Sequence, residues 1–167
     1  MKYLTNNEIA KLWNISERIV RNYWTKRTIS DKVLEKTIKP MRVYIRKMMK
    51  HDMTHEVSIT QYVYYEFFGG KDFVSFQIKE SGYMYNVTFN DATDLRFGSE
   101  FKAMCRKLEA NEGDFLIMHK INDNQYSIDI DKKNISSTRP YMPYFTGFRR
   151  HLIATINGLS INKEYIR

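Results

Sequence analysis

The sequence predicts an α+β protein, with a helical segment over residues 1–50 and a mainly antiparallel β domain with one or two packed helices over residues 51–167. Apolar residues recur at helical spacing in the first part and alternate with polar residues at period two over residues 56–89. The charge changes with the pattern. Residues 1–50 hold 13 Lys+Arg against 4 Asp+Glu (+9), residues 51–130 hold 7 against 13 (−6), and residues 131–167 hold 7 against 2 (+5).

The composition excludes several classes of protein. With 43% hydrophobic and 14% aromatic residues among 167, the chain can bury a core and is not a disordered protein. Its one cysteine cannot close an internal disulfide. There is no apolar run long enough for a membrane span and no secretory signal after Met1, so we expect a cytoplasmic protein without membrane contact.

The first helix is expected to begin at a capping box, Thr5-Asn6-Asn7-Glu8, in which the Thr hydroxyl and the Glu carboxylate bond each other's backbone amides. Asn14 follows at a turn, where Asn tolerates the left-handed conformation. Ser16 can then cap a second helix. The small Ala10 lets the two helices approach, and the residues expected to fill the wedge between them are Ile9, Trp13, Ile15, Val20 and Tyr23. This pattern is that of a helix-turn-helix, which completes the predicted fold class.

The run EIAKLWNISERIVRNYWTKRTIS resembles the helix-turn-helix of the MerR and phage-excisionase group of winged DNA-binding domains. The matching residues are Glu8, Ile9, Ala10, Lys11, Ile15, Ser16, Val20, Arg21, Asn22, Tyr23 and Ile29. The usual turn glycine is Asn14 here, no glycine follows the second helix, and no wing hairpin is evident. The resemblance implies that the Arg21-Asn22-Tyr23 positions contact or frame the DNA backbone.

On this basis we expect a recognition helix at about residues 16–26, since Arg can recognise guanine, Asn can recognise adenine and rim cations can neutralise phosphates. The candidate DNA-binding residues are Ser16, Glu17, Arg18, Arg21, Asn22, Tyr23, Lys26, Arg27, Arg42 and Arg46. The expected partner is double-stranded DNA, with a possible homodimer. Neither a cofactor nor a metal is expected.

Residues 31–50 extend the basic region. An apolar stripe at helical spacing predicts helix on both sides of Pro40, which would separate two helices. The stripe consists of Leu34, Ile38, Met41, Ile45 and Met48, and the cations beside it are Lys36, Lys39, Arg42, Arg46, Lys47 and Lys50. These cations could lie along phosphates, support a dimer seam or simply be solvated.

The acidic middle predicts strands, one helix and a hairpin. Two alternating faces are expected, one over residues 74–78 and one over residues 83–89, followed by the helix FKAMCRKL and a hairpin across Asn122-Asp123-Asn124. This order resembles the ending of the plant-type DNA-binding pseudobarrel, also found as an effector domain in EcoRII-type restriction enzymes. The matching features are the helix before Gly113-Asp114, the strand from Phe115 to Met118 and the closing strand through Tyr126. The resemblance implies that loops on one open face grip DNA, whereas the local charge of −6 argues against this segment as the main DNA-binding surface.

The tail contains an extended segment with two prolines, followed by an apolar stripe that predicts a helix. The stripe consists of Phe145, Phe148, Leu152, Ile156 and Leu159, with Arg149, Arg150 and His151 outside it. This helix could form a second basic contact, join a dimer or pack on the acidic middle.

A search for catalytic motifs is mostly negative. The sequence has no phosphate-binding loop, dinucleotide motif or nucleophile elbow. Cys105 lies on an apolar stripe and is expected to be inert core. His51, Asp52 and His55 could ligate a metal, but supply few ligands. Two short nuclease-like patterns, Asp72 with Gln77-x-Lys79 and Asp129 with Asp131-x-Lys133, are of a kind that arises by chance.

We therefore expect no enzyme. The predicted function is sequence-specific binding of double-stranded DNA by a regulator of transcription or of a mobile element, such as a phage or plasmid. The alternatives are an interaction or inhibitor module that binds an acidic partner, and a small nuclease or restriction-type specificity domain.

Overall fold

The computed structural model describes residues 6–14, 16–18, 20, 40–91, 94–133, 139–157 and 160–167. The chain forms two compact units. We call residues 1–41 with 155–162 the N-terminal unit, and residues 42–154 with 163–167 the sheet unit. Among the described residues, no helix has the length and apolar character needed to cross a membrane.

One mixed sheet of eight strands dominates the described chain, in the order β4-β3-β2-β6-β5-β1-β7-β8. The strands are β1 (Met41–Lys47), β2 (Phe73–Ile78), β3 (Met84–Asn90), β4 (Arg96–Phe97), β5 (Phe115–Lys120), β6 (Gln125–Asp131), β7 (His151–Asn157) and β8 (Ser160–Ile166). The helices among the described residues are α1 (Asn6–Trp13), α4 (Lys50–Thr54), the π-helix η1 (Val63–Phe67), α5 (Ser99–Lys107) and the 3-10 helix η3 (Met142–Tyr144). β2 and β6 run parallel, whereas β2 pairs β3 and β5 pairs both β1 and β6 in antiparallel fashion.

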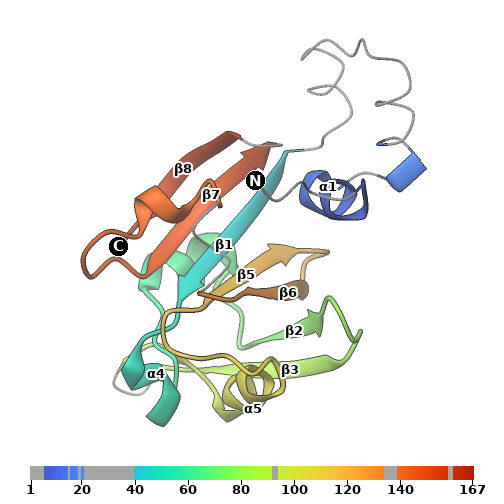
Figure 1. The fold of residues 1–167 in the computed structure, drawn as a ribbon. Coiled ribbons are helices and arrows are strands. Elements are labelled where there is room, and N and C mark those ends of the chain that lie inside the picture. The colour runs from blue at the N-terminus through green and yellow to red at the C-terminus, as the bar shows by residue number, and fades with distance from the viewer. Residues whose placement is uncertain are drawn as a thin grey trace. The chain divides into compact units, whose positions relative to one another are not determined.

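The sheet unit is built on an aromatic core, around which its strands curl (Figure 1). Phe68 lies at the centre of this core, with ring centroids 5.0 Å from Tyr126, 5.6 Å from Phe97 and 6.0 Å from Phe76. Phe97 also stacks on Phe101 of α5 at 3.9 Å. Each fully buried ring contributes about 1.5–3 kcal/mol through removal of its apolar surface from water. Lys102 of α5 reaches the end of α4, where its Nζ donates to the Thr54 carbonyl at 2.7 Å.

Most of the elements predicted for the acidic middle are confirmed, but residues 61–67, within the stretch 56–89 that was predicted as strands, are helical. Val74, Phe76 and Ile78 are the buried positions of β2, and α5 buries Phe101, Met104 and Cys105. β5 and β6 form the expected hairpin across Asn122-Asp123-Asn124. β2 and α5 expose one face and bury the other, so their periodicity is plain in the sequence.

The helix predicted over residues 41–50 is wrong, because residues 41–47 form β1. Val43, Tyr44 and Ile45 are all fully buried, so both faces of the strand are covered and the period-two alternation is lost. β-branched and aromatic residues of this kind favour a strand. Only the short α4, after Lys47, is helical.

The helix predicted over the tail is also wrong. Residues 151–157 form β7, in which four consecutive residues, His151 to Ala154, are buried. The helical spacing of Phe148, Leu152 and Ile156 therefore arises by coincidence in a strand with two covered faces. Gly158 and Leu159 lie outside the described residues.

In the N-terminal unit, α1 is present and Asn14 has the expected positive φ of 53°. Ile9, Ala10 and Val20 are buried together. The predicted fold class is nevertheless wrong. A curled mixed sheet forms the described body of the chain, and the described residues before it show one eight-residue helix and no helix-turn-helix. Residues 21–39, which include most of the predicted recognition helix, lie outside the described residues.

Candidate nucleic-acid interface

A buried ion pair fixes the chain where β1 passes into α4. Arg46 Nη2 lies 2.9 Å from both carboxylate oxygens of Asp52, and both side chains are buried. The same carboxylate accepts a hydrogen bond from the Met49 amide at 2.8 Å, at the start of α4. Because these contacts hold both ends of the connection, the segment from Lys47 to Lys50 has a defined path.

Two segments that are distant in the sequence, each with two cations, come together at the end of β1. The Lys47 amide donates to the Arg150 carbonyl at 3.0 Å, which places Lys47 next to Arg150, and Lys50 and Arg149 lie on the same two segments. The Arg150 amide in turn donates to the Arg167 carbonyl at 2.7 Å. We call Lys47, Lys50, Arg149 and Arg150 the basic edge. Lys50 and Arg149 are exposed, and Lys47 and Arg150 are partly exposed.

The cations of the basic edge are not neutralised within the described chain. Over the described residues, no ion pair joins any of them to an acid. Two nearby acids point inward: Asp52 pairs with Arg46, and Asp114 accepts from the Asn111 and Lys133 amides at 2.9 and 2.8 Å. A surface of uncompensated cations attracts polyanions.

His151 lies in the positive field of this region. It is buried, and Tyr44 Oη lies 2.9 Å from its Nδ1. Burial, reinforced by the positive charges of Arg46, Arg150 and Arg167, lowers the pKa of His151 to about 2. The imidazole therefore stays neutral at physiological pH and packs as part of the structure beneath the basic edge.

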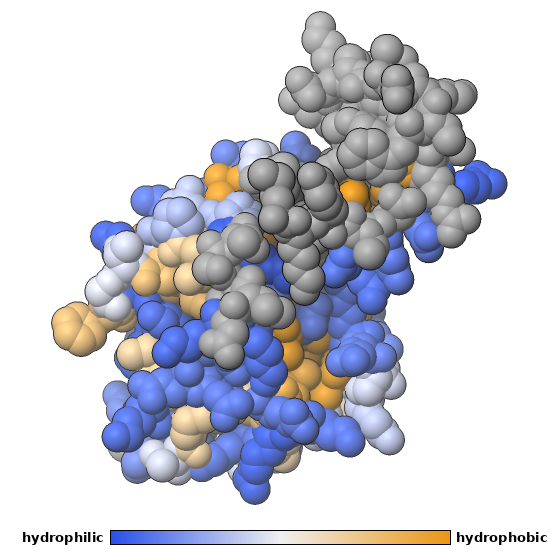
Figure 2. All heavy atoms as spheres, in the orientation of Figure 1, coloured by the Kyte–Doolittle hydropathy of each residue, from blue (hydrophilic) through white to orange (hydrophobic). Residues whose placement is uncertain are grey.

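A tight turn presents an aromatic ring beside these cations. Gly147 has a φ of +62°, which permits the turn, and the Arg149 amide donates to the Thr146 carbonyl at 3.4 Å. Phe145, before the turn, is buried against Phe115 with ring centroids 4.9 Å apart. The Phe148 side chain at the tip is 94% exposed. Figure 2 shows hydrophilic residues over most of the visible face of the sheet unit, and Phe148 is the most exposed large hydrophobic residue of the described chain.

A second polar surface lies on β3, β2, β6 and β5, and we call it the sheet face. Strand register places polar residues in neighbouring positions, namely the exposed or half-buried Ser75, Gln77, Asn86, His119 and Gln125 and the buried Ser127. Ser75 Oγ donates to Asn86 Oδ1 at 2.6 Å, and Ser127 Oγ lies 2.7 Å from His119 Nε2. These groups are therefore already hydrogen-bonded to one another.

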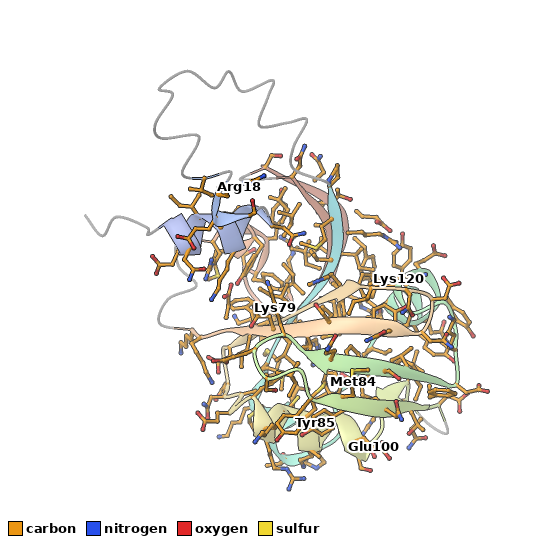
Figure 3. All side chains as sticks on the ribbon, turned by 90° about the vertical axis from the view of Figure 1, so that its right-hand side faces the viewer. Arg18, Lys79, Met84, Tyr85, Glu100 and Lys120 are labelled. Atoms are coloured by element: carbon orange, nitrogen blue, oxygen red, sulfur yellow. The ribbon has the colours of Figure 1, made fainter. Side chains whose placement is uncertain are left out.

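Cations also flank the sheet face, but acids neutralise them. Lys79 Nζ lies 3.9 Å from Asp129 Oδ2, and Lys120 Nζ lies 3.0 Å from Asp123 Oδ1. Figure 3 shows Lys79 and Lys120 toward opposite ends of these strands, with Met84 on β3. This surface has hydrogen-bonding groups but little free positive charge.

The predicted contacts on β1 are engaged inside the sheet unit. Arg46 is buried with Asp52, and Arg42 binds both carboxylate oxygens of Glu164, with Nε 2.8 Å from Oε2. Arg42 Nη1 also donates to the Glu66 carbonyl at 2.8 Å. Neither guanidinium is free to bind a phosphate, so we leave both out of the interface.

The predicted contacts before β1 fall partly within the described residues. Ser16, Glu17 and Arg18 are exposed on the N-terminal unit, and Figure 3 labels Arg18. These three stay predictions. The other candidates, Arg21, Asn22, Tyr23, Lys26 and Arg27, lie outside the described residues.

Sequence analysis did not single out the basic edge as a site. Lys47 and Lys50 were counted among helical cations, and Arg149 and Arg150 were assigned to a tail helix. The cations were visible in the sequence, but their convergence depends on the adjacency of β1 and β7 in the sheet. The exposed Phe148 was assigned to an apolar stripe for the same reason.

No catalytic or metal centre is evident among the described residues. The rings of His51 and His55 stack at 4.0 Å, but Asp52 faces Arg46, and no group of three potential ligands could hold a metal in this part of the chain. Cys105 is buried, as expected, and burial raises the pKa of its thiol to about 12. Asp129 pairs with Lys79.

Part of the chain has a counterpart among solved structures. No protein family matches the chain, and no curated protein matches it. Among solved structures it is similar to the N-terminal domain of Helicobacter pylori LlaJI.R1, with a TM-score of 0.55 and 24% sequence identity over 68% of this chain and 97% of that chain. The two share a fold. No feature of the described chain or of this comparison indicates an enzymatic reaction.

Proposed function

We propose that the protein binds double-stranded DNA through the basic edge. The main supporting observation is that Lys47 and Arg150 lie side by side, on two segments whose four cations have no acid partner among the described residues. Each cation placed on a phosphate releases a condensed counterion, which favours binding at low salt.

The charge of the folded unit is consistent with this proposal. The sheet unit contains 18 Lys+Arg and 15 Asp+Glu, a net charge of +3. The −6 of residues 51–130 therefore describes a stretch of sequence and not a folded surface. The charge of −6 over residues 51–130 is therefore no reason to exclude the sheet unit, whose net charge is positive, from DNA binding.

Two likenesses support the proposal. The middle of the sequence resembles the DNA-binding pseudobarrel, whose members grip DNA with loops on one open face. The basic edge likewise lies where elements begin and end, at the end of β1, the start of α4 and just before β7. The fold also occurs as the N-terminal domain of another protein, LlaJI.R1, which supports the sheet unit as a separate binding module.

We further propose that binding is sequence-specific and serves a regulator of transcription or of a mobile element. Selection of bound duplexes from a random pool tests this directly. Enrichment of one sequence is the expected result, and two-fold symmetry in that sequence would indicate a homodimer. If the protein instead bound every duplex of the pool equally well, binding would not be sequence-specific. It would then rest only on the attraction between the cations and the DNA phosphates.

The placement of the interface is tested with two double variants of equal charge change. We expect Arg149→Ala with Arg150→Ala to weaken binding of the selected duplex and to lower the slope of log affinity against log salt by roughly 2. The matched control is Lys79→Ala with Lys120→Ala, whose cations are already paired with acids. Fluorescence anisotropy across a salt series gives both quantities. Equal losses in the two variants, or no loss in the first, would remove the interface from the basic edge.

A further inference from the structure

Phe148 differs from the other exposed aromatic residues of the sheet unit. Its side chain is 94% exposed, whereas Tyr65, Tyr83 and Phe73 are 62%, 59% and 50% exposed. Tyr83 lies against Lys107 Nζ, 5.2 Å from the ring centroid, and Tyr65 against Tyr64. Among the described residues, no aromatic ring and no cation stacks on Phe148.

The turn holds this ring away from the core. On one side, Phe145 is buried between Phe115 and Tyr141, with ring centroids at 4.9 and 6.1 Å. On the other side, the backbone of Arg150 is bonded to Lys47 and Arg167. With both ends fixed, Phe148 cannot turn inward unless these contacts break.

The cations beside Phe148 indicate the chemistry of the molecule that it would contact. Arg149 and Arg150 follow it directly, and the Lys47–Lys50 connection lies alongside through the Lys47–Arg150 hydrogen bond. A rigid apolar tip flanked by unneutralised cations suits a polyanion that also offers flat apolar surfaces. Duplex DNA has both, since phosphates run along each edge of the stacked base pairs. Proteins that kink DNA insert Phe, Leu or similar side chains between base pairs in this manner.

We propose that Phe148 is a wedge that inserts between adjacent base pairs and unstacks them, while Arg149 and Arg150 hold the flanking phosphates. This inference rests on the proposed DNA binding and adds to it a distortion of the bound DNA. It also assigns the turn at residues 146–149 a role in recognition, because a step that unstacks easily is favoured at the site of insertion.

The experiment uses the full chain and the duplex obtained by selection, with 2-aminopurine substituted at successive positions. Unstacking relieves the quenching of this base, so we expect the protein to raise its fluorescence several-fold at one step. Phe148→Ala should abolish that rise and weaken binding about tenfold. Phe148→Leu, which keeps an apolar tip, should retain part of the rise. Tyr83→Ala, an exposed aromatic residue outside the basic edge, is the matched control and should behave as the unaltered protein.

The outcomes separate this inference from the proposed function. If the protein binds the duplex and no position brightens, or if Phe148→Ala brightens the same position, the wedge is wrong and DNA binding through the basic edge stands. If selection recovers no duplex, the proposed function is wrong and the wedge falls with it. If Phe148 is instead required for binding vesicles of phosphatidylserine and phosphatidylcholine, the ring is a membrane contact and the wedge is overturned.

Discussion

The basic edge and the sheet face are both polar surfaces of the sheet unit that carry cations, and they differ in how those cations are paired. On the sheet face, Lys79 and Lys120 each lie within 4 Å of an aspartate oxygen. No described acid pairs with the cations of the basic edge. A polyanion gains little from a lysine that already has an acid beside it. The comparison teaches that pairing, and not the number of cations in a stretch of sequence, marks a candidate DNA surface.

The two surfaces also differ in what supports them. Beneath the basic edge lies the buried Arg46–Asp52 pair, whose side chains are 0% and 1% exposed. The sheet face has instead the solvent-exposed Lys79–Asp129 pair, whose side chains are 47% and 46% exposed. The same kind of ion pair should therefore have very different effects on stability in the two places.

The largest expected effect comes from removing the acid of each pair. Asp52→Ala leaves the Arg46 guanidinium buried without its partner, and we expect a loss of about 3–5 kcal/mol in the free energy of unfolding. Asp129→Ala removes the exposed pair and should cost less than about 1 kcal/mol. Urea denaturation measures both. Similar losses for the two variants would show that the Arg46–Asp52 pair does not support the basic edge as the geometry indicates.

A second prediction compares the histidines of the two regions. Folding lowers the pKa of His151 from its ordinary value near 6.5 to about 2, through burial and nearby cations. His151 therefore leaves the free energy of unfolding unchanged above pH 6.5 and lowers it progressively as the pH falls from 6.5 toward 2. In that range the unfolded chain takes up a proton that the folded chain does not. The slope is about 1.4 kcal/mol per pH unit, or roughly 2 kcal/mol between pH 6.5 and 5.

His119 of the sheet face supplies the matched control. Its pKa is also lowered, by burial and by Lys79, but Asp129 opposes the shift and the side chain is only partly buried. We expect His151→Gln to flatten the dependence of unfolding free energy on pH between 5 and 6.5 more than His119→Gln does. Chemical denaturation at a series of pH values tests this. If His119→Gln reduced the pH dependence of the free energy of unfolding more than His151→Gln, the positive field around His151 would not be the stronger of the two.

The sequence was sufficient for β2, which has one covered face, and insufficient for β1 and β7, which have two. β2 alternates cleanly because Val74, Phe76 and Ile78 face the core and their neighbours face outward. In β1 and β7 consecutive residues are buried, so no period survives and a helical stripe can be fitted to either segment. Whether such a strand faces solvent on either side is decided by distant parts of the chain.

The failure to predict β1 as a strand also explains why the wrong cations were predicted as DNA contacts. Arg42 and Arg46 were predicted as DNA contacts because they lie four residues apart beside an apolar helical stripe. In a strand they share the side of Tyr44, and that side faces the core, where Arg46 meets Asp52. Lys47 lies on the opposite side and joins Arg150. The cations of the basic edge can be read from the sequence. Which of them face solvent depends on residues 41–47 forming a strand, and the sequence pattern did not predict that strand.

The smallest expected effect concerns two glycine turns, one in each region. Gly147 carries Phe148, and Gly82 closes the hairpin from β2 to β3, with φ of +62° and +74°. Alanine at either position must adopt a left-handed conformation, which costs about 1–2 kcal/mol, and an added Cβ meets no atom closer than 4.0 Å at either site. We therefore expect Gly147→Ala and Gly82→Ala to lower the free energy of unfolding by similar amounts. Gly147→Ala alone should weaken DNA binding and the 2-aminopurine response, because it disturbs the turn that presents Phe148. If the Gly82 variant weakened DNA binding equally, the sheet face would take part in the interface, and the contrast between the two regions would fail.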